Sequence, residues 1–371
     1  MRKGLIGQRN ASIRCSGDEH CICEGMCMKE RYVATLVGCA LGDTLGMPVE
    51  EWSREQIKKY VGRVTEPIAP FYIRDKQGTI LKKDELGVLK YYGKFYERGE
   101  YTDDTIRTLA LAESIAAVRG LDLVDAAKRQ LAEYESRILP DGTVRGGFGK
   151  TTIEGFKNLQ KGISPRESGV VGSPGNAPAM MMHPVGMYMH ASGDYKGGLD
   201  FAIAVAKMTH LDPRSIVSGV IQAHAIYDLL KGTSRRGFVE GIVDVCKEYE
   251  VPLDSRFKLC EAGNLASRME WIRDNMDVDR ELAFRKLGCT GLVYESYPFA
   301  LFMFQKYWDR PLEGLIETVN CGGDCDTTGA MYGALCGANN GMIFPDEWLV
   351  VAKGIDKLVI AAEKIHALNP K

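Results

Sequence analysis

The amino-acid sequence predicts an all-α protein with one large helical domain over residues 30–371. Apolar residues recur at three- and four-residue spacing along most of the chain, which is the period of an amphipathic helix. Alternating apolar and polar patterns, which indicate strands, are scarce. No strand followed by Gly-x-Gly-x-x-Gly and a helix occurs, so a dinucleotide-binding α/β fold is not indicated. The length of 371 residues suffices for a single large domain.

The first predicted helix covers residues 31–45, whose apolar positions have helical spacing and whose glycines indicate close packing against a neighbour. Gly42, Gly46 and Pro48 are predicted to end it. Residues 53–101 contain Pro67 and Pro70 and are predicted to form a long excursion of the lid or binding-loop type. Glycine-rich breaks are expected at 142–149 and 169–175. Further helices are predicted at 103–118, 123–136, 178–191, 196–208, 213–231, 235–249, 256–275, 294–307, 311–319, 326–337 and 345–366.

Composition excludes several classes of protein. The hydrophobic fraction of 45% and the charged fraction of 26% are typical of a globular chain. Lys and Arg number 47 against 49 Asp and Glu, so no basic field exists to hold nucleic acid. No apolar run approaches the ~20 residues of a membrane span, and the N-terminus lacks the apolar core of a secretory signal. We therefore expect a cytoplasmic protein with neither a nucleic-acid nor a membrane partner.

Residues 1–29 are predicted to be a separate N-terminal extension, because they are polar and show no sustained periodicity. Four of the 11 cysteines lie there, at positions 15, 21, 23 and 27. An odd total in a cytosolic chain argues against a disulfide framework. A zinc site with His20 is one alternative, but the spacing fits no common zinc finger. A loose or partner-bound arm is favoured.

Two short acidic motifs stand out, Tyr101-Thr102-Asp103-Asp104-Thr105 and the segment 322–329, which reads Gly-Gly-Asp-Cys-Asp-Thr-Thr-Gly. Each places two carboxylates and a threonine at the start of a predicted helix. Taken alone, either motif is most simply a helix cap. If the two converge, four like charges meet, and cations must neutralise them. Hard oxygen ligands of this kind suit Mg2+ or Mn2+, and several shared carboxylates can hold two ions.

These motifs resemble the ADP-ribosylglycohydrolase family, which includes dinitrogenase-reductase-activating glycohydrolases and hydrolases acting on ADP-ribosylated arginine or serine. The resemblance covers residues 31–340 and rests on five motifs in the family's order. They are Gly-Asp-Thr-Leu-Gly-Met-Pro-Val-Glu at 42–50, Thr-Asp-Asp-Thr at 102–105, Gly-Asn at 175–176, Thr-His at 209–210, and Gly-Asp-Cys-Asp-Thr at 323–327.

The resemblance implies an all-α fold, a single large domain of orthogonally packed helices, with a central cleft that holds two Mg2+ or Mn2+ ions. It assigns as metal ligands Thr102, Asp103, Asp104, Asp324, Asp326 and Thr327. Glu50 matches a glutamate at the metal centre of the family, so it is a candidate for metal binding, water positioning or gating. The candidate catalytic residues are Glu50, Asp104 and Asp326. For Asp43, in the same motif as Glu50, a structural capping role is favoured.

The resemblance also assigns the ADP-ribose side of the cleft, to residues Gly147, Gly149, Gly175, Asn176, Ala177, Met180 and His210. Two positions depart from the family's pattern. Ala177 replaces the usual second glycine of the Gly-Asn-Gly loop, which narrows the approach of the backbone to a ligand. Met181 stands where many members have arginine, so a phosphate contact or a structural contact of that arginine is expected to be missing.

The expected function is metal-dependent removal of ADP-ribose from a modified protein side chain, with arginine favoured by analogy to dinitrogenase-reductase-type members. The alternative is an immunity protein that binds and blocks an ADP-ribosyltransferase toxin through residues 1–29, with or without hydrolysis. A pseudoenzyme is disfavoured because the set of carboxylates is intact.

Overall fold

The computed structural model describes residues 27–70, 96–253 and 263–369. It confirms the all-α prediction, since extended pairing among the described residues is limited to isolated bridges. A short 3-10 helix, η1 (Met47–Val49), follows the first helix. The α-helices are α2 (Met28–Gly46), α3 (Arg54–Tyr60), α5 (Asp103–Val118), α6 (Leu123–Glu135), α7 (Lys150–Gln160), α8 (Ala177–Met181), α9 (His183–Ser192), α10 (Tyr195–Lys207), α11 (Pro213–Leu230), α12 (Arg235–Tyr249), α13 (Leu265–Asp274), α14 (Arg280–Leu287), α15 (Val293–Lys306), α16 (Pro311–Val319), α17 (Cys325–Asn340), α18 (Asp346–Val351) and α19 (Ile355–His366).

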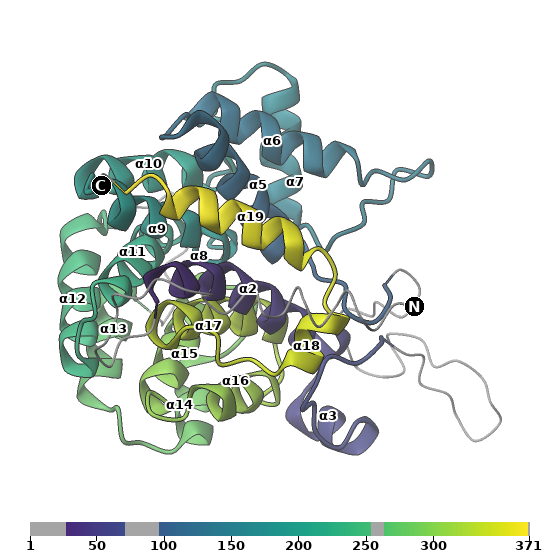
Figure 1. Cartoon of the computed structure of the whole chain (residues 1–371), viewed down its shortest axis with the longest axis vertical. Helices are drawn as coiled ribbons and strands as arrows, with labels where there is room; N and C mark the ends of the chain where they lie inside the picture. The colour runs from purple at the N-terminus through teal and green to yellow at the C-terminus, as the bar shows by residue number, and fades with distance from the viewer. Residues whose placement is uncertain (1–26, 71–95, 254–262, 370–371) are drawn as a thin grey trace, which may run out of the picture.

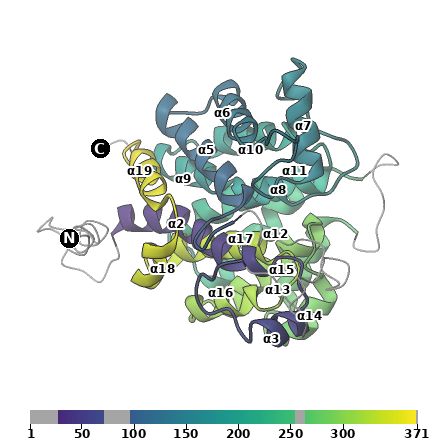
Figure 2. The same ribbon diagram turned by 90° about the vertical axis from the view of Figure 1, so that its right-hand side faces the viewer.

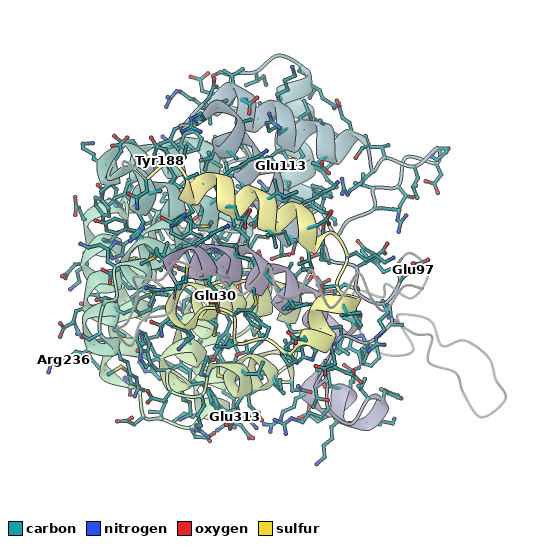
Figure 3. All side chains as sticks on the ribbon, viewed as in Figure 1. Glu30, Glu97, Glu113, Tyr188, Arg236 and Glu313 are labelled. Carbon is teal, nitrogen blue, oxygen red and sulfur yellow. The ribbon has the colours of Figure 1, made fainter. Side chains whose placement is uncertain are left out.

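Helices α2 and α17 form the centre of the molecule, with α5, α6, α9 and α10 on one side and α14 and α16 on the other (Figures 1 and 2). Helix α19 packs against both α2 and α5. Most apolar side chains of these layers form one large core, and Ile106, Tyr134, Phe148 and Phe156 form a second, smaller cluster. Charged side chains such as Arg236 on α12 and Glu313 on α16 point outward at the periphery (Figure 3). Because apolar side chains fill the space between these layers, a polar functional site can lie only at the ends of the central helices.

Glycine lets α2 and α17 pack backbone against backbone. A Cβ atom added to Gly42 would lie 1.9 Å from the carbonyl oxygen of Gly329, and one added to Gly38 would lie 2.2 Å from that of Gly333. No side chain fits into such a contact. The pairing is antiparallel, because a position later in α2 meets one earlier in α17. The C-terminal end of α2 is thereby held beside the N-terminal end of α17.

The segment 28–49 also meets the length and composition of a membrane span, with a mean hydropathy of 1.3. This differs from the sequence-based expectation that no run approached that length. The apolar window is wholly buried inside the protein, however. Its apolar character is therefore explained by its place as the central core helix.

Several predicted boundaries are wrong. The helix expected at 178–191 is divided at Met182 into α8 and α9, and the one expected at 345–366 is divided near Gly354, whose φ is +68°. The excursion at 53–101 contains α3, whose N-cap Ser53 forms a capping box with Gln56. Helices α7 and α14 were not predicted. Of the helix expected at 256–275, residues 256–262 lie outside the described residues.

The predicted boundary after residue 29 stays a prediction. Helix α2 begins at Met28, and Lys29 forms an ion pair with Glu363 of α19 at 2.8 Å. Residues 1–26 lie outside the described residues, together with three of the four clustered cysteines and the proposed partner-binding arm.

Candidate metal centre and ADP-ribose cleft

A cleft of about 230 Å³ lies where α5 and α17 begin. The structure brings into it every residue that the sequence analysis assigned to the site, except Thr102, which is buried directly beneath. Those lining it are Glu50, Asp103, Asp104, Gly147, Gly149, Gly175, Asn176, Ala177, Met180, His210, Asp324, Asp326 and Thr327.

The two acidic motifs meet because each opens a central helix. Thr102 is the N-cap of α5 and Asp324 is the N-cap of α17. The turn before α17 is pinned on both sides, since Asp324 N–H donates to the Cys289 carbonyl at 2.7 Å and Gly323 N–H donates to the Trp52 carbonyl at 2.9 Å. Gly323 has φ +74°, and a Cβ there would lie 2.1 Å from the Cys289 carbonyl oxygen, so only glycine fits.

Glu50 reaches the cleft from the C-terminal end of α2, through η1. It is 2% exposed. The next residue, Glu51, has a left-handed φ of +62° and its N–H donates to the Gly323 carbonyl at 2.6 Å. The segment that carries Glu50 is thus paired directly with the loop that carries Asp324. A non-glycine residue in this conformation is strained by about 1 kcal/mol or more, a cost that clusters at functional sites.

Carboxylates gather in two overlapping groups at the floor of the cleft. Oxygens of Glu50, Asp324 and Asp326 lie within 4.8 Å of one another, and so do oxygens of Asp43, Asp104 and Asp326. Asp326 belongs to both groups. Carboxylate oxygens gathered this closely are suited to hold a divalent cation.

Asp43 caps α5, as its capping role predicts. Its carboxylate accepts hydrogen bonds from the Thr102 and Thr105 backbone N–H groups at 2.9 Å and 3.1 Å, and from the Thr105 hydroxyl at 2.6 Å. Burial raises the pKa of Asp43 to about 7, against the opposing effect of these donors. Asp43 therefore caps α5 and at the same time belongs to the second acidic group of the cleft.

Asp104 is the clearest sign that the centre is built for a cation. Burial, followed by the charges of Asp43, Asp103 and Asp324, raises its pKa well above the usual range. Its Oδ1 is buried and has no hydrogen-bond partner among the described residues. The Thr102 hydroxyl lies 3.0 Å from Asp104 Oδ2 and 3.3 Å from Asp326 Oδ2. An all-oxygen set with excess negative charge and an unsatisfied carboxylate oxygen fits Mg2+ or Mn2+.

The residues assigned to ADP-ribose also line the cleft. Asn176 donates its side-chain amide to Asp324 Oδ2 and, at 2.9 Å, to the Ser296 hydroxyl, so it also orients a carboxylate of the metal centre. His210 is 2% exposed, and its Nε2 lies 2.6 Å from the place where a Cβ of Gly175 would be. Gly147 and Gly149 lie in the loop before α7.

Met181, which stands where many family members have arginine, is linked through Gln130 to an arginine on another helix. Met181 is buried, and its Sδ lies 3.5 Å from Gln130 Nε2. The other end of that amide, Gln130 Oε1, accepts a hydrogen bond at 3.1 Å from Nε of Arg107 on α5. Arg107 is 0% exposed. A buried guanidinium therefore does stand below the cleft, although it comes from a position that the sequence analysis did not single out.

Other lining residues were also missed. Glu51, Lys150, Thr151, Thr152, Ser173, Gly291 and Leu292 complete the cleft. For Lys150 and Thr151 a signal existed, because they follow a glycine-rich turn and open a helix, as residues at anion sites do. For Gly291 and Leu292 the sequence carries no such signal, since only tertiary packing brings them near.

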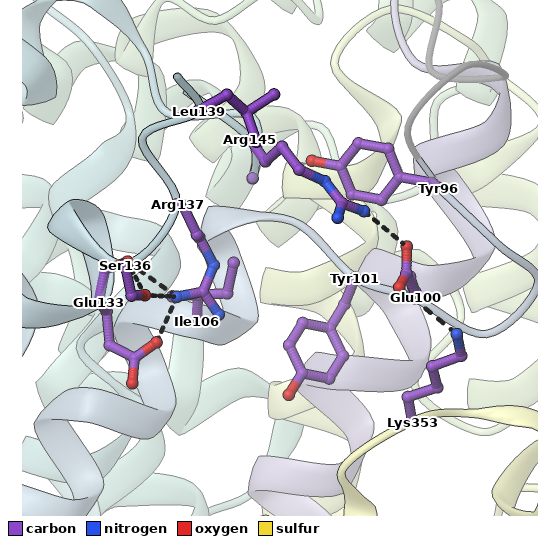
Figure 4. A pocket seen from close by; sticks show the side chains of 11 residues that line it. Tyr96, Glu100, Tyr101, Ile106, Glu133, Ser136, Arg137, Leu139, Arg145 and Lys353 are labelled. Carbon is purple, nitrogen blue, oxygen red and sulfur yellow. Dashed lines mark hydrogen bonds and ion pairs between the residues drawn. The ribbon is translucent and has the colours of Figure 1, made fainter. Parts of the chain in front are cut away.

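Figure 4 shows a second cavity, of about 480 Å³. Tyr96 and Arg145 stand together on one wall, and Arg137 with Glu133 on another, while Tyr101 points into the space between. Tyr96 and Gly146 both line this cavity, and Gly146 is next in sequence to Gly147 of the cleft. Burial and then the charge of Asp103 raise the pKa of Tyr96, so this wall lies within electrostatic reach of the metal centre.

On the outer rim of this cavity, Lys353 forms ion pairs with Glu97 at 2.6 Å and Glu100 at 3.4 Å. Figure 3 shows Glu97 at the edge of the molecule, and Figure 4 shows Lys353 reaching toward Glu100. These contacts tie the segment before α5 to the segment between α18 and α19.

The sequence profile of the ADP-ribosylglycohydrolase family matches residues 26–370. The chain belongs to this family. An uncharacterized protein of Archaeoglobus fulgidus is 28% identical over 345 residues, covering 92% of this chain and 98% of its own length. The ADP-ribosylhydrolase ARH3 of Mus musculus is 29% identical, covering 72% of this chain and 76% of its own. Among solved structures, a chain of an "ADP-ribosylglycohydrolase-related protein complex" has the same fold, with a TM-score of 0.63, 23% identity and coverage of 92% and 99%.

The resemblance stated from the motifs is thereby confirmed. Members of the ADP-ribosylglycohydrolase family are metal-dependent hydrolases that remove ADP-ribose from modified proteins, and the acidic groups described above are suited to metal. The comparisons give no support to the toxin-binding alternative, and its proposed arm lies outside the described residues.

Proposed function

We propose that this chain hydrolyses the N-glycosidic bond between ADP-ribose and an arginine side chain of a modified protein, with two Mg2+ or Mn2+ ions bound. The observation that carries the proposal is the position of Asp326 in both acidic groups of the cleft. Buried carboxylates so close together repel one another unless cations lie between them. The choice of arginine rests on analogy with family members rather than on a contact in the cleft.

The residues that would hold the ions are Thr102, Asp103, Asp104, Asp324, Asp326 and Thr327, with Glu50 beside them. Bound divalent ions supply Lewis-acid sites for ribose hydroxyls and a water of lowered pKa. Asn176 keeps Asp324 in its orientation, and the α5 cap keeps Asp104 in place. The chain itself thus fixes the ribose ring relative to the carboxylates before the bond breaks.

Glu50 is the proposed proton acceptor, because it lies in the cleft within 4.8 Å of Asp324 and Asp326. Asp104 and Asp326 act with it as the catalytic carboxylates. The wall formed by Gly147, Gly149, Gly175, Asn176, Ala177, Met180 and His210 would hold the ADP part. The second cavity of about 480 Å³ offers room for a part of the substrate that lies outside the cleft.

The test is release of ADP-ribose from peptides carrying ADP-ribosylated arginine or serine, and from ADP-ribosylated RNA phosphate. Each reaction is run with Mg2+, with Mn2+ and with a chelator, and the matched control is Asp326→Asn, which keeps size and shape. We expect metal-dependent release from the arginine peptide and none by the variant. Release from the serine peptide alone would overturn the linkage, and full release in chelator would overturn the metal centre.

A further inference from the structure

His210 presents only one edge to the cleft. Its Nε2 faces Gly175, and its Nδ1 lies 2.9 Å from the hydroxyl oxygen of Thr209. Burial, and after it the positive charge of Arg107, lowers the pKa of His210 to about 3. The ring is therefore neutral near pH 7 and carries a single proton. Which nitrogen carries that proton decides whether the cleft faces a hydrogen-bond donor or an acceptor.

Thr209 receives a hydrogen bond from a group that can only donate. Arg107 donates from Nη2 to the Thr209 hydroxyl oxygen at 3.4 Å and from Nη1 to the Thr152 hydroxyl oxygen at 3.3 Å. Its Nε donates to Gln130 Oε1. Its guanidinium also lies 5.6 Å from the ring centre of Phe156. Burial lowers the pKa of Arg107 to about 10, with the nearby Asp103 and Asp104 opposing the shift, so the side chain stays protonated at neutral pH.

The proton of the Thr209 hydroxyl then needs an acceptor other than Arg107. Thr209 is 0% exposed, and within the described parts of the chain the remaining side-chain partner of its hydroxyl is His210 Nδ1. A buried hydroxyl proton without an acceptor is costly. If the Thr209 hydroxyl donates to His210 Nδ1, that nitrogen must be unprotonated, and the single ring proton must be bound to Nε2.

We infer that Arg107 and Thr209 act as positioning residues that fix His210 in its Nε2–H tautomer, so that the cleft wall beside Gly175 offers a donor to an oxygen of the ligand. That the ligand is an ADP-ribosyl group rests on the proposed function. The direction of the hydrogen bonds does not depend on the proposed function, because Arg107 can only donate and the Thr209 hydroxyl has a single proton. His210 contacts the ligand, and the two other residues act through it.

The test is nitrogen NMR of the ligand-free protein, with 15N-labelled histidine, near pH 7. The signals of His210 among the six histidines are assigned by their loss in His210→Gln. We expect the wild type and Thr209→Ser to show the Nε2–H pattern. Thr209→Val has nearly the same shape without the hydroxyl, and it should show a mixture of tautomers. Arg107→Met frees the hydroxyl to accept from Nδ1–H, and it should show a mixture as well.

A wild-type Nδ1–H pattern, or an unchanged single tautomer in Thr209→Val, would overturn the inference. An unchanged tautomer in a folded Arg107→Met would remove Arg107 from it, and if that variant does not fold, Thr209→Val still decides the matter. In parallel, calorimetric titration with ADP-ribose should show affinity weakened about tenfold by Thr209→Val and kept by Thr209→Ser. Failure of all variants and the wild type to bind ADP-ribose would refute the proposed function, whereas the NMR result would stand on its own.

Discussion

Substitution Gly42→Ala tests whether the packing of α2 on α17 sets the geometry of the metal centre. The added Cβ would lie 1.9 Å from the Gly329 carbonyl oxygen and 2.8 Å from the Ala330 nitrogen, and all of these contacts are backbone. No side chain can rotate away, so the helices must part by about 1 Å. Overpacking of this kind costs about 3 kcal/mol, and the better helix propensity of alanine returns about 1 kcal/mol. The free energy of unfolding should therefore fall by about 2 kcal/mol.

The same displacement should harm activity more than stability. Glu50 follows the C-terminal end of α2 and Asp326 lies in the first turn of α17, so parting the helices moves one against the other. A misplacement of about 1 Å can reduce kcat/KM about 100-fold. Urea unfolding and release of ADP-ribose from the modified arginine peptide would measure the two effects on the same preparation.

Gly219→Ala is the matched control for Gly42→Ala. It lies in the buried helix α11, where an added Cβ would lie 3.2 Å and 3.3 Å from two atoms of the flexible Met182 side chain and 3.4 Å from the Cβ of Pro178, so only a small adjustment is needed. Its stability should change by less than about 1 kcal/mol and its activity should be kept. A Gly42→Ala protein as stable and active as the Gly219→Ala protein would refute this account of how the centre is held.

Three further predictions concern the cleft and the core. Asp324→Ala should abolish hydrolysis and weaken the binding of Mn2+ measured by calorimetry. The metal-free variant should stay folded or gain stability, because the substitution removes one of several like charges. A variant that keeps its activity would argue against Asp324 as a metal ligand. Ala177→Val should weaken binding of ADP-ribose by calorimetry because it crowds the loop, whereas Ala177→Gly should bind equally well or better, and equal affinities in all three proteins would place the loop away from the ligand. Burial lowers the pKa of His183 to about 3, so the unfolded chain binds a proton that the folded chain does not, and the stability from this group is lost as pH falls from 6.5 toward 3. In urea unfolding at pH 4 to 6, His183→Gln should therefore show a pH slope smaller by about 1.4 kcal/mol per pH unit, and equal slopes would contradict this.

Local signals were sufficient for much of the fold. The predicted bounds of α12 and α16 match the structure, because Ser234 caps the first and Pro311 opens the second. The division between α18 and α19 near Gly354 was missed, because a single glycine within an apolar pattern does not by itself indicate a left-handed turn. The short helices α7 and α14 were missed because a pattern of two or three turns is easily hidden among polar residues.

The candidate site was predicted in part because its residues sit in compact motifs at helix starts. Their convergence depends on the contact between α2 and α17, which the glycines only suggested. Arg107 was overlooked for a physical reason, because an arginine in an amphipathic helix is normally exposed, and its burial is set by Gln130, Thr152 and Thr209 from other elements. The second cavity around Tyr96 likewise depends on segments far apart in sequence.

The most direct test of the central claim is a calorimetric titration of the metal-free protein with Mn2+, followed by measurement of ADP-ribose release at each metal content. Two ions should bind per chain, and release from the modified arginine peptide should appear only as the second ion binds. Asp326→Asn, which alters the carboxylate shared by both acidic groups, should lose the second ion and the activity together. Full activity with no bound ion, or two ions bound as tightly by Asp326→Asn, would contradict the account.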